Sequence, residues 1–276
     1  MSVSLEQGIP FRPSGPFGRI AWHWRHDRKA ELWMSWYAMV FFYNLFGVVF
    51  VGLTHVMPPP QPYWDDAEVA QWFRHYHSGL LVGFGIIFLI SGLVAACNAL
   101  IAYSMRRMSV SRAFAYSYIA IYSLSATPGM LLTAIVLSVG AMRPERDPRL
   151  IHWLYDMAFM CFVGTMGVFL IGTLVWLIAI LIDRNKVFPK WFGYLNICNM
   201  ITEFVVAPAW IFKAGVFSWN GTIAFWIDTA VFVVYTIAFI VLLRKMIERE
   251  DFGDGPLPGN GASLFLAPGL QEGSDQ

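Results

Sequence analysis

The 276-residue chain is 57% hydrophobic and 17% aromatic, and only 13% of its residues are charged, about half the charged share of an ordinary soluble domain. A globule of this length has too little interior to hide so much apolar surface, which excludes a water-soluble protein and makes lipid part of its solvent. The net charge of +1 and the lack of a basic run argue against nucleic acid as a partner.

The N-terminal segment, residues 1–31, is predicted to be cytoplasmic and uncleaved, because it contains no short apolar run that ends at a small-residue cleavage site. Six apolar stretches then reach the length of about 20 residues that a helix needs to cross a bilayer. They are predicted at 32–56, 79–104, 114–139, 152–182, 191–213 and 222–244. Residues 32–250 are therefore expected to form one all-α, polytopic transmembrane bundle, followed by a flexible, Gly- and Pro-rich cytoplasmic tail at 251–276.

The distribution of basic residues predicts the orientation. With the N-terminus inside, fourteen lysines and arginines lie in cytoplasmic segments and five lie outside. Because cytoplasmic loops are enriched in these residues, both termini are expected in the cytoplasm of a cell whose inner or plasma membrane holds the protein.

The loop after the first predicted helix is the largest external feature. It opens with the proline run of Met57-Pro58-Pro59-Pro60, and Asp65 to Glu68 then have the composition of a helix N-cap and first turn. An apolar stripe at helical spacing follows from Val69 to Tyr76. It predicts a short external helix between helices 1 and 2, or an outward extension of helix 2. Gly79 and Gly83 form a GxxxG pattern, which predicts close helix packing.

Four strings carry a resemblance to other proteins: MPPP in the first external loop, RPERDP before the fourth helix, FPKWFGYLN entering the fifth and FSWNGTIAFWI entering the sixth. In these strings the chain resembles a family of uncharacterised multi-pass bacterial membrane proteins, found chiefly in actinobacteria and proteobacteria. The resemblance implies a six-helix bundle and brings no catalytic residues with it.

The fifth predicted helix carries the most costly polar group. Glu203 lies near its middle, and Asn196 and Asn199 precede it by seven and four residues. At about 100° per residue the three share one face, which is expected to look into the bundle. Structural hydrogen bonding between helices and a functional role in ligand or proton binding are both open interpretations of Glu203.

Further polar groups are predicted near the external side. Asp228 lies in the sixth helix with Tyr235 on the same face, and His152 and Asp156 lie one turn apart in the fourth. The candidate ligand-binding residues are Asn196, Asn199, Glu203, Asp228, Tyr235 and Asp156. Histidines and carboxylates are ligands of transition metals, so a second candidate set is His55, His75, His77, His152 and Asp156. His75 and His77 would point about 200° apart on one helix, which weakens the metal interpretation.

These features leave three functions open. The favoured one is the binding or transport of a small or lipophilic molecule in an intramembrane polar cavity. The second is a membrane-embedded enzyme in which Glu203, Asp228, His152 or Asp156 performs acid–base or metal-assisted chemistry on a hydrophobic substrate. The third is an accessory subunit that packs against a membrane partner or a second copy of the chain. No motif in the sequence indicates a cofactor.

Overall fold

The computed structural model describes residues 15, 29–125, 127–164 and 166–250. The chain divides into two compact units, of which Lys29–Glu248 contains nearly all of the described residues. The predicted cytoplasmic tail lies outside the described residues, as does most of the predicted N-terminal segment. Across the described residues the structure is all-α and contains no strand.

The first helix is α2 (Ala30–Gly47), which continues as a π-helical turn, η1 (Val48–Leu53). His55 follows with a positive φ of 50°. The backbone N–H groups of Val56 and Met57 both donate to the carbonyl of Phe50, at 3.0 Å each. This left-handed residue followed by returning hydrogen bonds is a helix C-terminal cap, so the backbone at His55 ends the helix.

Helix α3 (Asp66–Ile90) begins where the sequence predicts a cap. The Asp65 side chain accepts a hydrogen bond from the backbone of Glu68 at 2.8 Å, and the Glu68 side chain accepts one from the backbone of Asp65 at 2.9 Å. This is a capping box, which satisfies two otherwise unpaired N–H groups. The prediction of a separate short external helix is wrong, because α3 runs without a break into the next predicted span. Its buried stripe, which includes Val69 and Phe73, keeps the first turns packed against the bundle.

The second predicted span is divided. Helix α3 ends at Ile90, Ser91 and Gly92 form a turn, and α4 (Leu93–Arg106) follows. Helix α5 (Arg112–Ser125) leads to the π-helical turn η2 (Thr127–Leu131) and to α6 (Leu132–Met142). Helices α7 (Pro148–Gly164) and α8 (Met166–Ile182) lie on either side of residue 165.

The fifth predicted span, 191–213, is too long. Helix α9 (Lys190–Val205) has 16 residues and is followed by a single 3₁₀ turn, η3 (Ala207–Trp210). Pro208 has no N–H to continue the α-helical hydrogen bonds, which is why α9 ends there. After a loop, the π-helical turn η4 (Thr222–Ile227) leads directly into α10 (Asp228–Arg249).

Four helical stretches among the described residues are long and apolar enough to cross a membrane, fewer than the six predicted. They are Ala30–Leu53, Asp66–Ile90, Arg112–Met142 and Thr222–Arg249. Helix α4 and the apolar part of α8, Phe169–Ile182, are apolar but shorter. These four stretches support a membrane-embedded protein.

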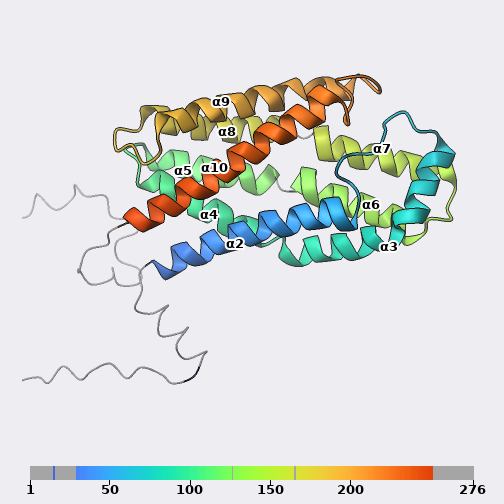
Figure 1. Ribbon diagram of the computed structural model, residues 1–276, viewed down its shortest axis with the longest axis horizontal. Coiled ribbons are helices and arrows are strands. Elements are labelled where there is room, and N and C mark those ends of the chain that lie inside the picture. Colours follow the sequence, from blue (N-terminus) through green and yellow to red (C-terminus); the bar gives the residue numbers. More distant parts are fainter. Residues whose placement is uncertain (1–14, 16–28, 126, 165, 251–276) are drawn as a thin grey trace, which may run out of the picture. The chain divides into compact units, whose positions relative to one another are not determined.

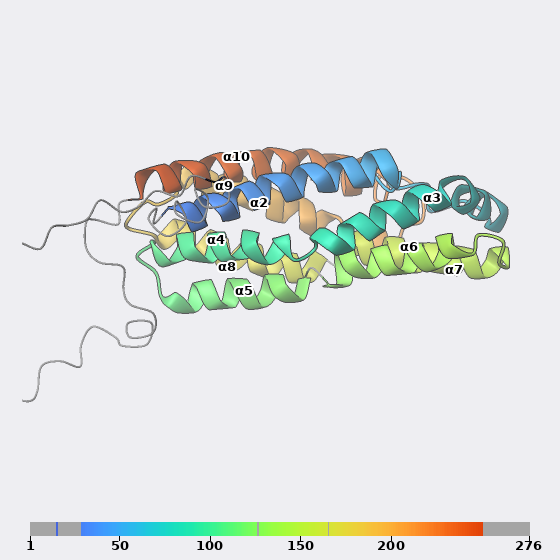
Figure 2. The same ribbon diagram turned by 90° about the horizontal axis from the view of Figure 1, so that it is seen from below.

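The helices of Lys29–Glu248 run back and forth beside one another (Figures 1 and 2). Helices α2, α4, α5, α8 and α9 are successive neighbours in one half of this unit, and α3, α6 and α7 pack together in the other half. Helix α10 is joined to α2 by a hydrogen bond from Trp36 Nε1 to the carbonyl of Ile240 at 2.9 Å.

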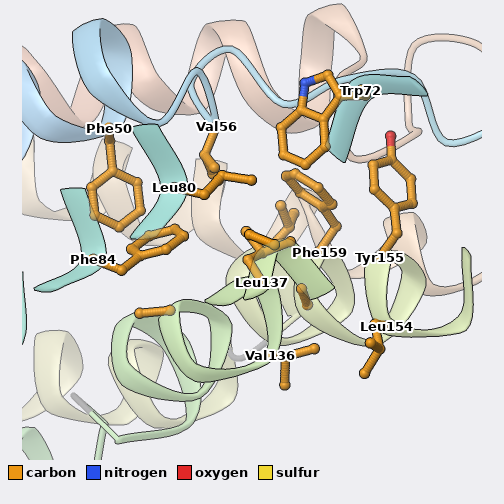
Figure 3. Close-up of a cluster of buried hydrophobic side chains, with 14 of the residues drawn as sticks. Phe50, Val56, Trp72, Leu80, Phe84, Val136, Leu137, Leu154, Tyr155 and Phe159 are labelled. Atoms are coloured by element: carbon orange, nitrogen blue, oxygen red, sulfur yellow. The ribbon is translucent and has the colours of Figure 1, made fainter. Parts of the chain in front are cut away.

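The main hydrophobic cluster fills the half formed by α3, α6 and α7. Figure 3 shows Phe50, Leu80 and Phe84 meeting side chains of α6 and α7, among them Leu137 and Phe159. Gly79 and Gly83 let the backbone of α3 approach Leu53 and Thr54 closely, as predicted for the GxxxG pattern. A Cβ atom on Gly79 would overlap the carbonyl oxygen of Leu53, and one on Gly83 would come within 2.5 Å of Thr54 Cγ2.

Hydrogen bonds between loops hold each end of the bundle. At one end Asp183 Oδ1 accepts from the backbone and hydroxyl of Ser109, at 2.8 and 3.1 Å, and Asn185 donates to the carbonyl of Arg107 at 2.9 Å. At the other end Trp219 Nε1 donates to the carbonyl of Pro60 at 2.8 Å, and Tyr155 donates to that of Gln61 at 2.7 Å. The loops after α4 and α8 therefore meet at one end, and those before α3 and α10 meet at the opposite end.

Candidate functional site

The polar strip of α9 is buried. The exposed fractions of Asn196, Asn199 and Glu203 are 0%, 2% and 8%. By contrast, Ile201 and Phe204 on the opposite side of the same helix are 57% and 66% exposed. The prediction that the strip faces the interior of the bundle is therefore confirmed. Ile201 and Phe204 face outward, where a membrane would cover them.

The hydrogen bonds of the strip leave several of its oxygens free. Asn196 Nδ2 donates to the carbonyl of Thr173 in α8 at 3.0 Å, and Asn199 Nδ2 donates to Glu203 Oε1 at 2.7 Å. A carbonyl oxygen only accepts, so the amide of Asn196 must place its nitrogen on Thr173 and its oxygen elsewhere. Of these two bonds, only that of Asn196 joins α9 to another helix. Asn199 and Glu203 bond to each other within α9.

Asp228 comes to the same site from the start of α10. Its carboxyl group makes a side-chain hydrogen bond with Thr202 and lies within electrostatic range of Glu203. The Thr202 hydroxyl also donates to the carbonyl of Asn199 at 3.0 Å. Helix α9 contacts η4, so the π-helical turn that precedes Asp228 sets the position of this carboxyl group beside α9. The structure thus brings two predicted carboxyl groups together from two helices.

Tyr235 follows Asp228 by about two turns of α10. Its ring stacks on Phe192 of α9, with a centroid distance of 5.3 Å and an angle of 8° between the rings. It also lies within electrostatic range of Glu203 and of Tyr122 in α5. The Tyr122 hydroxyl is 3.1 Å from Thr173 Oγ1, and the carbonyl of Thr173 accepts the bond from Asn196. Tyr122 and Thr173 were not predicted as site residues, because their contacts depend on how α5 packs on α8.

Four buried oxygens of α9 and α10 have no hydrogen-bond partner in the described part of the chain: Asn196 Oδ1, Asn199 Oδ1, Glu203 Oε2 and Asp228 Oδ1. Trp176 Nε1 in α8 is also buried, and it interacts with the side chain of Tyr235. A buried unpaired polar atom costs about 1–3 kcal/mol, so these oxygens indicate a missing partner. We call the set Asn196, Asn199, Thr202, Glu203 and Asp228 the interior polar site.

The remaining predicted residue, Asp156, belongs to a different cluster at the opposite end of the bundle from the Asp183 loops. His152 Nδ1 is 2.6 Å from Asp66 Oδ1 and His152 Nε2 is 3.7 Å from Asp156 Oδ1. The predicted proximity of His152 and Asp156 is present, but the shorter contact is to Asp66, which the sequence did not indicate because it lies in α3. Asp156 is therefore not part of the interior polar site.

The other histidines are placed differently from the predicted metal set. His77 Nδ1 is 2.9 Å from the carbonyl of Arg74, and the ring of Tyr76 lies 4.5 Å from the rings of both His55 and His75. Among the described residues no three His, Cys, Asp or Glu side chains are close enough together to hold a metal ion. The five predicted metal ligands are all described, and the structure does not assemble them into one site.

No protein-family model matches the chain, and no curated protein and no solved structure matches it at a significant level. The interior polar site must therefore be interpreted from its own geometry.

Proposed function

We propose that the chain is a multi-pass protein of a bacterial inner or plasma membrane and that it binds a small molecule at the interior polar site. The observation that carries this proposal is the set of four buried oxygens without partners on Asn196, Asn199, Glu203 and Asp228. A bound molecule with complementary hydrogen-bonding groups would supply the partners that these atoms lack.

Six membrane crossings are part of the proposal. Three of the four long apolar stretches, Ala30–Leu53, Arg112–Met142 and Thr222–Arg249, each make one crossing. The remaining stretch is α3, which makes a fourth crossing together with α4. Helices α7 and α8 together supply the fifth. The sixth is made by α9 and η3. The 16 residues of α9 span about 24 Å, so the turn η3 and the loop after it would complete the crossing of a hydrocarbon core of about 30 Å. Short or interrupted helices of this kind occur where a membrane protein lines a polar site.

Both termini are proposed to be cytoplasmic. The end of the bundle at which α4 and α8 finish carries six exposed basic residues, Arg106, Arg107, Arg112, Arg184, Lys186 and Lys190. Asp183, the acid at their centre, is buried and accepts hydrogen bonds from four donors, including the backbone N–H groups of Asn185 and Val187. The basic side chains therefore dominate this end, as expected for a cytoplasmic face.

Ligand binding accounts for the site better than structural hydrogen bonding alone does. A polar group that holds helices together makes its bonds across the helix interface. Here Asn199 and Glu203 bond to each other along α9, and each keeps one oxygen unpaired. Two bonds cross between helices, from Asn196 to Thr173 in α8 and between Thr202 and Asp228 in α10. The cost of burying the four oxygens that remain unpaired is thus not offset by helix association.

The accessibility of the site to a small polar reagent tests the proposal. Cys97, Cys161 and Cys198 are free thiols and would first be replaced by alanine. In that background the Asn199→Cys variant should react with 2-aminoethyl methanethiosulfonate, because a thiol in a polar cavity ionises and the reagent is small and cationic. The Phe204→Cys variant, on the exposed side of the same helix, should not react in membranes, because a thiol in hydrocarbon stays protonated.

A second variant tests the same site in case Asn199→Cys misfolds. Thr202→Cys conserves the size of the side chain and lies beside Asp228, so it should react as Asn199→Cys does. Failure of both folded variants to react, while a loop cysteine in the same preparation reacts fully, would show that the strip is sealed packing and would overturn the proposed function.

A further inference from the structure

The interior polar site holds two carboxyl groups and no positive charge. Glu203 and Asp228 lie within electrostatic range of each other, and among the described residues neither forms an ion pair with a lysine, arginine or histidine. Two like charges together in a buried site are strongly unfavourable, so both groups cannot be ionised there without a compensating cation. When the site is empty, protons must supply that compensation.

We propose that the interior polar site binds a small monovalent cation, an alkali-metal ion or a primary ammonium group, in exchange for one proton. This inference rests on the proposed function and names the class of molecule that the site takes.

The unpaired atoms match a cation better than they match an anion or a neutral acceptor. Three of the unpaired oxygens, on Asn199, Glu203 and Asp228, gather at the last turn of α9, whereas Asn196 lies about 10 Å further along the helix. An alkali ion is bound by such oxygens, and the three N–H groups of a primary ammonium donate to them. The site also lies at the last turn of α9, since Glu203 is two residues before the helix ends. The carboxyl end of a helix carries partial negative charge, which favours a cation.

Charge balance sets both the valence and the proton count. A single buried carboxylate without a counter-charge is also unfavourable, so the empty site is neutral with two protons. With one cation of charge +1 and one remaining proton it is neutral again. Binding therefore releases one proton from either Glu203 or Asp228 to water. A divalent metal is disfavoured, because no third His, Cys, Asp or Glu joins these two carboxyl groups within the described chain.

The groups around the two carboxyls would not mask this exchange. The titratable side chains within electrostatic range of Glu203, besides Asp228, are Tyr122 from α5 and Tyr235 from α10, and Tyr43 from α2 interacts with both tyrosines. A tyrosine has an ordinary pKa of about 10, so it carries no charge near neutral pH. From helix α8, Thr173 contacts Asn196 and Trp176 contacts Tyr235, and neither side chain titrates. The proton released on binding must then come from Glu203 or Asp228.

Proton release from the purified full-length chain in detergent, measured with a pH indicator in weak buffer, tests the exchange. At neutral pH, addition of sodium, potassium or methylammonium chloride should release up to one proton per chain, because the bound cation replaces a proton in the site. Tetramethylammonium chloride should release none, because it has no N–H donor and its methyl groups keep oxygens away. Comparing sodium with methylammonium distinguishes an alkali-ion site from an ammonium site.

Matched variants locate the exchange. Glu203→Gln and Asp228→Asn should each abolish the release and keep the fold, because the amides still form hydrogen bonds. Glu145→Gln, an exposed acid elsewhere, should leave it unchanged. The absence of release from the wild type with all three cations, or the same release from both amide variants, would overturn the cation proposal. If Asn199→Cys still reacts with the thiol reagent in that case, the site binds a different small molecule and the proposed function stands.

Discussion

Asp66 Oδ1 lies 2.6 Å from His152 Nδ1, and this contact joins the first turn of α3 to the start of α7. The other ring nitrogen of His152 faces Asp156 across one turn of α7, at 3.7 Å. Both carboxylates are about half exposed, whereas the histidine is mostly covered. The contact therefore fixes the first turns of α3 to the rest of the bundle at a site that water and salt still reach.

The coupling between Asp66 and His152 should be small and sensitive to salt. A double-mutant cycle with Asp66→Asn and His152→Gln should give a coupling of about 0.2–1 kcal/mol at low ionic strength, the range for exposed ion pairs. The coupling should shrink at high salt because exposed charges are screened. Thermal denaturation of the purified protein in detergent measures it. Independent effects of the two substitutions at low salt would show that the contact does not stabilise the fold.

Close packing at Gly79 should make alanine there strongly destabilising. A Cβ atom at this position would overlap the backbone carbonyl of Leu53, and a backbone atom cannot move aside as the end of a side chain can. We expect Gly79→Ala to cost on the order of 1–3 kcal/mol, the range for overpacking of a tight interface.

Gly85 offers the matched control on the same helix. A Cβ atom at Gly85 meets nothing within 4 Å, so Gly85→Ala should leave the thermal midpoint unchanged or raise it slightly, because alanine favours helix more than glycine does. Equal losses for the two variants would show that helix propensity, and not contact with Leu53, decides the stability of this region.

Several features of the fold could be predicted because their causes are local. The Asp65 cap needs only residues within one turn, and the buried strip of Asn196, Asn199 and Glu203 needs only helical periodicity and the cost of polar groups in lipid. Both predictions are confirmed. The continuation of α3 through residues 66–78 was one of two open alternatives in the sequence, because the apolar stripe fits an interfacial helix equally well.

Features that depend on tertiary contacts could not be predicted. Asp66 precedes His152 by 86 residues, and nothing local pairs them. The end of α4 is tied to the loop after α8 through Asp183, which in the sequence is an ordinary polar residue after an apolar run. The turn at Ser91 and Gly92 interrupts a stretch that is apolar throughout, so hydropathy alone gave one helix there. The proximity of Glu203 and Asp228 depends on the π-helical turn before α10, which the sequence does not signal.

Asp183 should control the order of the basic loop that follows α8. Its carboxylate accepts hydrogen bonds from the backbone of Ser109, Asn185 and Val187, and an alanine would leave these donors unpaired. We expect Asp183→Ala to increase trypsin cleavage at Arg184 and Lys186 at least several-fold under native conditions. Ser109→Ala removes only the hydroxyl bonds and should give a smaller increase. Unchanged cleavage in Asp183→Ala would mean that packing alone orders the loop.

The sidedness of the membrane can be tested with one exposed residue from each end of the bundle. Tyr63 is 63% exposed and lies in the loop before α3, whereas Gln61 in the same loop is held by hydrogen bonds from Tyr155 and Asn220 and would be a poor reporter. Ser111 is exposed beside the basic residues before α5. In a background without the three native cysteines, an impermeant maleimide applied to intact spheroplasts should label Tyr63→Cys and spare Ser111→Cys. Lysis should make Ser111→Cys reactive, which shows that its thiol is accessible once the cytoplasmic face is open. The expectation follows from the six basic residues that surround Ser111 and Asp183, since moving them across the membrane during insertion would oppose the bias that sets topology. Labelling of Ser111→Cys before lysis, with Tyr63→Cys spared, would reverse the orientation and would place the Asp183 loops outside the cell.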